Sequence, residues 1–160
     1  MPINYIQQTR DFYEHLGYRP YQWFYADTPA PWTSLSKPLS KSRLGMISTA
    51  GTYVKGQVAY FYKDDTSFRK IPRNTPVADI RFSHVTENHL VEPRKDPNTI
   101  FPIQALNQLE KEGFIGELSE NFLSCMGGIY SQRRVRSELI PELVKEILEQ
   151  KIDLLLLVPL

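Results

Sequence analysis

The amino-acid sequence predicts an α/β protein, with an open, mainly parallel sheet and flanking helices, like half of a Rossmann or flavodoxin-like fold. An aromatic and proline-rich N-terminal arm precedes it. In the second half of the chain, helical patterns alternate with short apolar strand patterns. The last of these strands, Leu154–Val158, is apolar on both faces, which is typical of a strand inside a parallel sheet covered by helices. Ten of the 12 prolines lie at or before Pro102, so the first two thirds should be rich in loops.

Composition narrows the class of protein. The 160 residues are 41% hydrophobic, enough for the core of one domain. With 19 Lys and Arg against 18 Asp and Glu, no overall field attracts nucleic acid or an anionic membrane. The single cysteine, Cys125, excludes an internal disulfide and a cysteine-cluster metal site. No signal peptide or membrane-spanning run is visible, so we expect a cytoplasmic protein with neither a nucleic-acid nor a membrane partner.

The N-terminal region predicts a helix followed by an arm. Apolar residues recur at helical spacing from Asn4 to Leu16, with Asn4 as a possible N-cap and Gly17 as a stop. From Tyr18 to Lys41, prolines alternate with aromatic residues, which favours an extended arm packed by its aromatics. We therefore expect a helix and arm over residues 1–41, and an α/β domain, incomplete at its C-terminal end, over residues 42–160.

The first elements of that domain are strands. Arg43–Thr49 is a short apolar run that ends in a tight turn, and Val58–Tyr62 is a lesser strand candidate. Asp79–His84 alternates apolar and polar residues, as a half-buried strand does. Pro102 then suits the first position of a helix that ends at Gly113.

The remaining elements complete the α/β pattern. Asn121–Met126 reads as a strand that ends at two glycines. Ser137 or Ile140 opens a final helix, with Pro141 tolerated near the first turn. Because right-handed helical crossovers join strands of this kind, we expect Arg43–Thr49, Asn121–Met126 and Leu154–Val158 to be parallel neighbours.

Candidate site residues cluster where strands end. The turns containing Thr49 and Gly51, and Gly127 and Gly128, can offer backbone N–H groups to an anion. Neither turn is a nucleotide-binding motif, and we predict no cofactor. His84 stands at a strand end, where it can donate a proton to a leaving amine or orient a substrate carboxylate. A structural role, with the imidazole bonded to a loop carbonyl, is the alternative.

Three further groups have both functional and structural interpretations. Arg69 can clamp a carboxylate, or pair at the surface with Asp64 or Asp65. Cys125 is interpreted as an inert core thiol, with a reactive thiol as the alternative. The cluster of Arg133, Arg134 and Arg136 is interpreted as a solvated helix surface, with phosphate or RNA contact as the alternative.

A metal site is the remaining option among the candidate residues. His84, Glu87 and His89 could form one, but their spacing matches no established zinc pattern. We therefore predict no metal.

An ordered set of short motifs resembles the glycine/sarcosine/betaine/D-proline reductase selenoprotein B family, roughly from Tyr18 onward. The motifs are Pro29-Ala30-Pro31-Trp32, Ser48-Thr49-Ala50-Gly51, Phe68-Arg69-Lys70-Ile71-Pro72, Ser83-His84, Asp96 to Ile103, Glu112 to Gly116, Met126-Gly127-Gly128 and Asp153 to Pro159. Each is weak by itself, and the resemblance depends on their order. It places Asp96 and Asn98 in a loop near the active face, where helix capping is the alternative, and adds Ser83 to the substrate-binding candidates.

The resemblance also implies an activity. Family members are subunits of reductase complexes that split a carbon–nitrogen bond of a small amino acid or amine, using a selenocysteine directly after the strand that matches Leu154–Val158. The resemblance implies that this chain ends at that position and is inactive by itself. The expected partners are the substrate and the other subunits of the complex. The competing hypothesis is a non-catalytic module that holds a small anion in its glycine loops.

Overall fold

The computed structural model describes residues 3–20 and 25–160, which fall into two compact units that divide between Ser34 and Leu35. The first unit contains helix α1 (Tyr5–His15), whose N-cap Asn4 accepts a hydrogen bond from the backbone of Gln7. Gly17 follows the helix with a φ of +78°. The predicted N-terminal helix is confirmed with both of its end signals.

The arm was expected to be packed by its aromatic residues. Residues 25–34 form neither helix nor strand, and the side chains of Tyr25 and Trp32 are exposed. Prolines in this stretch lack the N–H that a strand ladder needs. The other arm aromatics, Tyr21, Trp23 and Phe24, lie outside the described residues.

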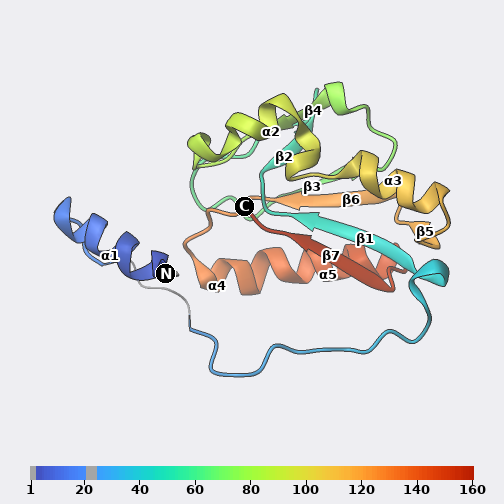
Figure 1. The fold of residues 1–160 in the computed structure, drawn as a ribbon, viewed down its shortest axis with the longest axis horizontal. Helices are drawn as coiled ribbons and strands as arrows, with labels where there is room; N and C mark the ends of the chain where they lie inside the picture. The colour runs from blue at the N-terminus through green and yellow to red at the C-terminus, as the bar shows by residue number, and fades with distance from the viewer. Residues whose placement is uncertain (1–2, 21–24) are drawn as a thin grey trace. The chain divides into compact units, whose positions relative to one another are not determined.

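The second unit is built on a five-stranded, mainly parallel sheet (Figure 1). Its strands are β1 (Arg43–Ser48), β3 (Phe68–Pro72), β5 (Glu117–Leu118), β6 (Asn121–Cys125) and β7 (Leu154–Val158). Strand β1 pairs in parallel with β7 along one side and with β5 and then β6 along the other. Strand β3 pairs with the far side of β6 in the antiparallel direction. The prediction that β1, β6 and β7 are parallel neighbours is confirmed.

A second, two-stranded sheet joins β2 (Thr52–Val54) to β4 (Ile80–Phe82) in the antiparallel direction. Strand β4 confirms the strand predicted at residues 79–84. The strand predicted at Val58–Tyr62 is wrong, because the backbone carbonyls of Val58 and Ala59 accept hydrogen bonds from the Arg69 guanidinium instead of from a neighbouring strand. Strands β2 and β3 were not predicted.

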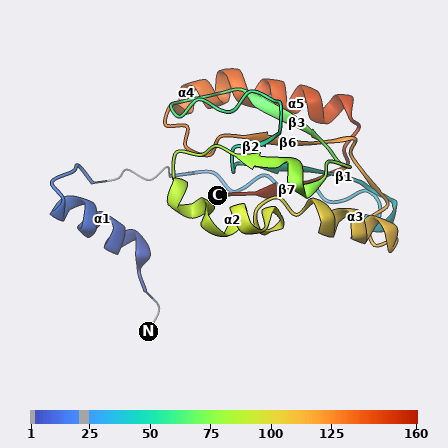
Figure 2. The same cartoon turned by 90° about the horizontal axis from the view of Figure 1, so that it is seen from above.

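Helices cover both faces of the sheet (Figure 2). Helices α2 (Val91–Lys95) and α3 (Ile103–Lys111) lie on one face, and α4 (Gln132–Arg134) and α5 (Ile140–Glu149) lie on the other. Alternate residues of β1 supply the two cores. Met46 packs with Phe101 and Phe122 on the first side, and Ile47 packs with Leu123 and Leu143 on the second. The α/β prediction is therefore confirmed.

The final helix, α5, begins at Ile140, one of the two starts predicted. It continues a helical segment that was not predicted, which starts at Gln132 and includes a π-helical turn at Val135–Leu139. The widened turn directly precedes Pro141, whose ring would otherwise crowd the carbonyls of the preceding turn. No helix in the described ranges is both long and apolar enough to cross a membrane.

Strand β7 occupies a different place in the sheet from the one expected. Its residues contribute to both cores, Leu154 and Leu156 to one and Leu155 to the other, which agrees with a strand that is apolar on both faces. Within the described residues, however, β7 pairs only with β1 and is an edge strand instead of an internal one.

Candidate active site at the carboxyl edge of the sheet

The carboxyl ends of the parallel strands β1, β6 and β7 lie together (Figure 1), and His84 lies against them. A Cβ atom placed on Gly127, which follows β6, would lie 2.8 Å from the Thr49 carbonyl oxygen, 3.0 Å from His84 Nε2 and 3.1 Å from the Leu160 carbonyl oxygen. Thr49 follows β1 and Leu160 follows β7, while His84 follows β4. Only glycine fits at this point, and the edge of a parallel sheet beyond the strand ends is where ligands bind in open α/β folds.

His84 is buried but not fully hydrogen-bonded. The Nδ1 atom of its imidazole accepts a hydrogen bond from the Thr86 N–H (3.1 Å) and lies 2.7 Å from Thr86 Oγ1. Because Nδ1 acts as an acceptor, the proton of the neutral ring is assigned to Nε2. Nε2 is buried and has no hydrogen-bond partner among the described residues. A buried N–H donor without an acceptor is costly, and a bound water, ion or ligand would satisfy it.

The charge state of His84 follows from its surroundings. Burial lowers the pKa of His84 below its ordinary value, the nearby His89 lowers it further, and Glu87 acts in the opposite direction. The imidazole is therefore neutral near pH 7. A neutral ring with its proton on Nε2 is suited to donate a hydrogen bond to an anion, and less suited to transfer a proton outright.

Close backbone contacts fix the position of His84. Gly51 has a φ of +62°, and a Cβ atom there would lie 2.0 Å from the Ser83 carbonyl oxygen. The Ser83 N–H donates to the Gly51 carbonyl (3.0 Å) and Ser83 Oγ donates to the Tyr60 carbonyl (3.2 Å). On the other side, a Cβ atom on Gly128 would lie 2.2 Å from Val85 Cγ1. Two glycines thus allow the chain on either side of His84 to press against the strand ends.

The turn after β1 holds the strand ends together. The N–H groups of Thr49, Ala50 and Gly51 donate to the Val158 carbonyl, Ser48 Oγ and the Cys125 carbonyl. The Leu160 N–H in turn donates to Thr49 Oγ1 (3.0 Å), which fixes the end of β7 beside this turn. These backbone donors already have protein acceptors, whereas His84 Nε2 and Thr52 Oγ1 are buried without a partner among the described residues.

Arg69 lies at the same edge, opposite Ser124 in the pairing of β3 with β6. Its guanidinium donates to the Val58 carbonyl and to Ser67 Oγ, both at 2.8 Å, and lies 4.4 Å from the centre of the Tyr60 ring. Arg69 forms no salt bridge with either Asp64 or Asp65, the two surface partners considered above. In this structure Arg69 holds the loop between β2 and β3.

The loop before α3 reaches the rim of this edge, where Ser48 Oγ donates to the Ile100 carbonyl (3.1 Å). Asp96 Oδ1 accepts a hydrogen bond from the Asn98 N–H (3.0 Å), and Asn98 Oδ1 accepts one from the Gln104 N–H in the first turn of α3 (3.1 Å). Both side chains therefore act as caps in this structure.

The metal alternative has no support in the structure. Among residues 3–20 and 25–160, no three His, Cys, Asp or Glu side chains are grouped so that they could hold a metal ion, and His84, Glu87 and His89 form no such group. Glu87 is instead paired with Arg94.

Cys125 is buried, and burial raises the pKa of its thiol to about 11. It is therefore a protonated core thiol near pH 7. In the arginine cluster, Arg134 binds Glu138, the Asp64 carbonyl and Thr66 Oγ1, which fastens α4 to the loop before β3.

Sequence reasoning missed two residues of this edge. Thr86 fixes the ring of His84, and its signal is its position two residues after a candidate histidine. Tyr60 donates to the Ser124 carbonyl at the end of β6 (2.6 Å), and burial raises the pKa of its phenol. Tyr60 lies in the segment Val58–Tyr62, which was predicted to be a strand, so it was not considered as a site residue.

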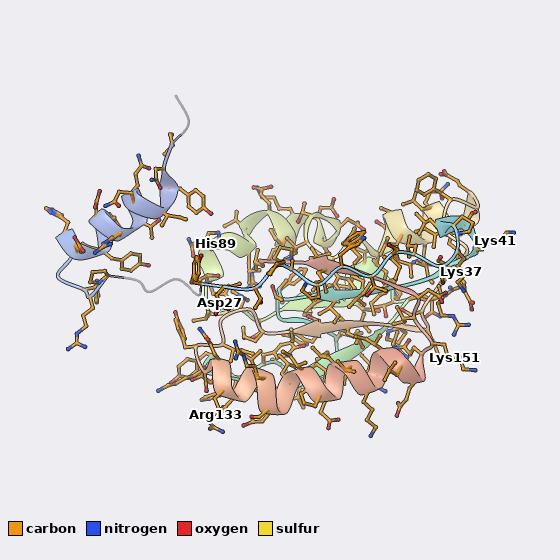
Figure 3. All side chains as sticks on the ribbon, turned by 90° about the horizontal axis from the view of Figure 1, so that it is seen from below. Asp27, Lys37, Lys41, His89, Arg133 and Lys151 are labelled. Atoms are coloured by element: carbon orange, nitrogen blue, oxygen red, sulfur yellow. The ribbon has the colours of Figure 1, made fainter. Side chains whose placement is uncertain are left out.

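The opposite, amino edge of the sheet carries an open cavity of about 400 Å³. Figure 3 labels three of its lysines, Lys37, Lys41 and Lys151, at one end of the second unit, with His89 at the other end. Ion pairs line the cavity: Lys37 with Asp153 (2.6 Å) and Arg43 with Glu117 (2.8 Å). None of the predicted site residues lies in its lining.

Comparison with known proteins agrees with the motif order. The family model described as glycine/sarcosine/betaine reductase selenoprotein B matches residues 88–159, which include the loop before α3 and strands β6 and β7. The chain belongs to this family. It is 34% identical over 131 residues to the D-proline reductase subunit gamma of Acetoanaerobium sticklandii. The matched region covers 81% of this chain and 54% of that protein.

Two further facts define the extent of the likeness. The chain spans about half the length of this curated relative. No solved structure matches the chain.

Proposed function

We propose that this chain is part of a reductase subunit that cleaves a carbon–nitrogen bond of a small amino acid or amine. In this proposal it forms the protein wall of the active site and lacks the residue that reacts, so it is inactive by itself. One observation carries the proposal: the unpartnered Nε2 of buried His84 converges with the end of β7 at the carboxyl edge of the sheet. The resemblance places the family's selenocysteine directly after that strand.

The proposed reaction needs a nucleophile and a source of electrons, and the described residues of this chain supply neither. Reductive cleavage of a C–N bond forms one C–H and one N–H bond, and so consumes two electrons and two protons. Cys125, the chain's single cysteine, is buried and protonated, and supplies neither a thiolate nor electrons here. A selenol, which is ionised at neutral pH, can supply the nucleophile, and together with a thiol it can supply the two electrons and two protons, ending as a selenosulfide.

His84 suits one of the two roles expected of it. Because its ring is neutral and Nε2 carries the proton, it can donate a hydrogen bond to the carboxylate of an amino acid and orient the substrate. Its lowered pKa makes it a poor reservoir for the proton that the leaving amine needs. We therefore assign to His84 the orientation of the substrate, and retain Ser83, Arg69, Asp96 and Asn98 as supports of the same edge.

Partners and location follow from the same proposal. The relative is named as a subunit of D-proline reductase, and we propose that this chain also acts within a multi-subunit reductase. Cytoplasmic location is part of the proposal, because a selenol requires a reducing compartment.

The test compares two polypeptides. The first ends at Leu160, and the second continues through the following reading frame with selenocysteine or cysteine at the next position. We expect no turnover of glycine, betaine, sarcosine or proline by the first. We expect turnover by the second, with its partner subunits, and a loss of about 10²-fold or more in kcat/KM for His84→Gln. His15→Gln, on α1, serves as the control.

Turnover by the 160-residue polypeptide that Cys125→Ser abolishes would contradict the proposal. A non-catalytic anion-binding module is the second candidate, favoured by the free N–H donor of His84. The codon after Leu160 separates the two. UGA followed by in-frame coding sequence supports the reductase, and UAA or UAG without a continuing frame supports the binding module.

A further inference from the structure

The outer edge of β7 is unprotected in the second unit. Strand β7 pairs with β1 from Leu154 to Val158, and no other described strand pairs with it. Half of the backbone N–H and C=O groups of an edge strand point away from its neighbour. Natural proteins protect such an edge with charges, prolines or bulges, or cover it. Strand β7 consists of four leucines and one valine, with no such protection within it.

The flank of α5 on the β7 side is also apolar. On one flank of α5, buried Glu146 forms an ion pair with Lys70 of β3, which lies on the far side of the sheet from β7. Ile140, Val144 and Leu148 recur at intervals of four residues, so they share the opposite flank. Leu148 is 70% exposed, and the other two are about half exposed.

Leu157 continues this apolar surface onto the strand. Leu155 and Ile147 both pack against the buried cluster beneath α5. Side chains alternate along a strand, so Leu157 faces the same side as Leu155, yet it is 65% exposed. Ile140, Val144, Leu148 and Leu157, together with the outer edge of β7, are called the β7 flank below.

The direction of the chain shows what geometry would cover the β7 flank. From β6 the chain passes through α5, crosses β1 and enters β7, with α5 on the face opposite α2 and α3 (Figure 2). Crossovers between parallel strands are almost always right-handed. A further parallel strand beyond β7 continues in the same direction, so its crossover helix must lie on the same face as α5. That position is directly over the β7 flank.

We propose that the β7 flank is the docking surface for a strand-and-helix unit of the same reductase subunit, supplied by the part of the full-length protein that these 160 residues do not contain. This inference rests on the proposed function. Nearly half of the length of the D-proline reductase subunit gamma lies outside the match, whereas a complete βαβ unit needs only about 30 residues. The four side chains of the flank are uncharged, which fits the apolar stripe of a helix.

The test places a charge on the flank in two backgrounds. Leu148→Asp and Leu157→Asp are made in the 160-residue polypeptide and in the polypeptide extended through the following reading frame, with cysteine as the next residue. We expect little change in Tm in the short form, where both side chains are already exposed. In the extended form we expect each to lower Tm by about 5 °C or more, because the aspartate is then buried.

A matched control uses an exposed aromatic outside the flank. Phe114, in the turn after α3, is 62% exposed, and Phe114→Asp should change Tm equally in the two polypeptides. Equal small effects of the flank substitutions in both polypeptides would overturn the inference, as would a gene with no reading frame beyond Leu160. A dimer of the short form that Leu157→Asp dissociates, with no effect in the extended form, would identify a second copy as the occupant instead.

Activity separates this inference from the function on which it rests. An active extended reductase whose Tm is indifferent to the flank substitutions overturns only the docking surface. An extended protein that is destabilised by them, yet has no reductase activity when it carries selenocysteine and its partner subunits, overturns only the proposed function.

Discussion

The two edges of the sheet differ in how their polar groups are satisfied. At the amino edge, an open cavity is lined by charged side chains that pair with one another, Lys37 with Asp153 and Arg43 with Glu117. At the carboxyl edge, the backbone is packed so closely that Gly127 has no room for a Cβ atom, and His84 keeps a buried N–H donor without an acceptor. The open edge thus contains two ion pairs, whereas the closely packed edge keeps a buried donor without an acceptor.

This difference shows that an open cavity and a buried hydrogen-bond donor without a partner can lie at opposite ends of one domain. Exposed ion pairs contribute little free energy and tolerate change. An unsatisfied buried donor is costly, and it requires an explanation such as strain, a catalytic role or a bound water or ion. Substitutions at the carboxyl edge should consequently have larger effects than those at the amino edge.

The largest effect is expected at Gly51. Gly51→Ala places a Cβ atom 2.0 Å from the Ser83 carbonyl oxygen and adds the strain of a positive φ. We expect the free energy of unfolding, measured with urea, to fall by more than about 3 kcal/mol. Gly56 also has a positive φ, but nothing lies within 4 Å of its Cβ position, so Gly56→Ala should cost about 1–2 kcal/mol. Equal losses in the two variants would show that the contact with Ser83 is not decisive.

Arg69 is expected to matter less, but still measurably. Arg69→Met removes hydrogen bonds to the Val58 carbonyl and Ser67 Oγ and the contact with the Tyr60 ring. We expect a loss of about 1–2 kcal/mol in chemical denaturation. The control is Arg81→Met, since among the described residues Arg81 donates to the nearby carbonyls of Ala78 and Ile80. If Arg69→Met lowers the free energy of unfolding no more than the control does, the loop before β3 keeps its conformation without Arg69.

His84 gives the carboxyl edge a pH dependence of stability. Its folded pKa is lowered, so below its unfolded value of 6.5 the unfolded chain binds a proton that the folded chain does not. Its contribution is complete above pH 6.5 and is lost as the pH falls toward the folded pKa, at no more than about 1.4 kcal/mol per pH unit. His84→Gln should flatten the curve of unfolding free energy between pH 7.5 and 5.5. An unchanged slope, equal to that of His15→Gln, would contradict this assignment.

The smallest effect is expected at the amino edge. Glu117→Gln breaks the ion pair with Arg43, which is partly exposed to solvent. We expect less than about 1 kcal/mol, and a smaller difference in 0.5 M salt than in 20 mM salt, because salt screens such pairs. A loss above 2 kcal/mol that salt does not reduce would reverse the ranking of the two edges.

The sequence was informative where apolar runs formed strands between helices. Strands β1, β6 and β7 were predicted with their parallel pairing, because their apolar residues leave little alternative to burial. Strand β3 was missed because Arg69 and Lys70 interrupt its pattern. Val58–Tyr62 has a strand-like composition, but its carbonyls are used by a side chain distant in sequence.

The candidate site was predictable to the level of a shared edge. The rule that parallel strands end together predicted that His84, Gly51 and Gly128 face the same edge of the sheet, and in the structure Gly51 approaches Ser83 while Gly127 approaches His84. The unpaired state of Nε2 was not predictable. It depends on Thr86 occupying Nδ1 and on two glycines that bring the backbone close, and these are properties of the packed chain.

The pairing of β1 with β7 has a consequence for folding kinetics. The Arg43 N–H, at the start of β1, donates to the side chain of Asp153, 110 positions later in the chain. The central strand is synthesised early, whereas its partner along one whole side follows 110 positions later. Contacts between such distant segments slow folding, so refolding is expected in the range of milliseconds to seconds. During synthesis, Met46 and Ile47 lack their neighbours in β7 until that strand has been made. In this interval the nascent sheet is prone to incorrect strand pairing.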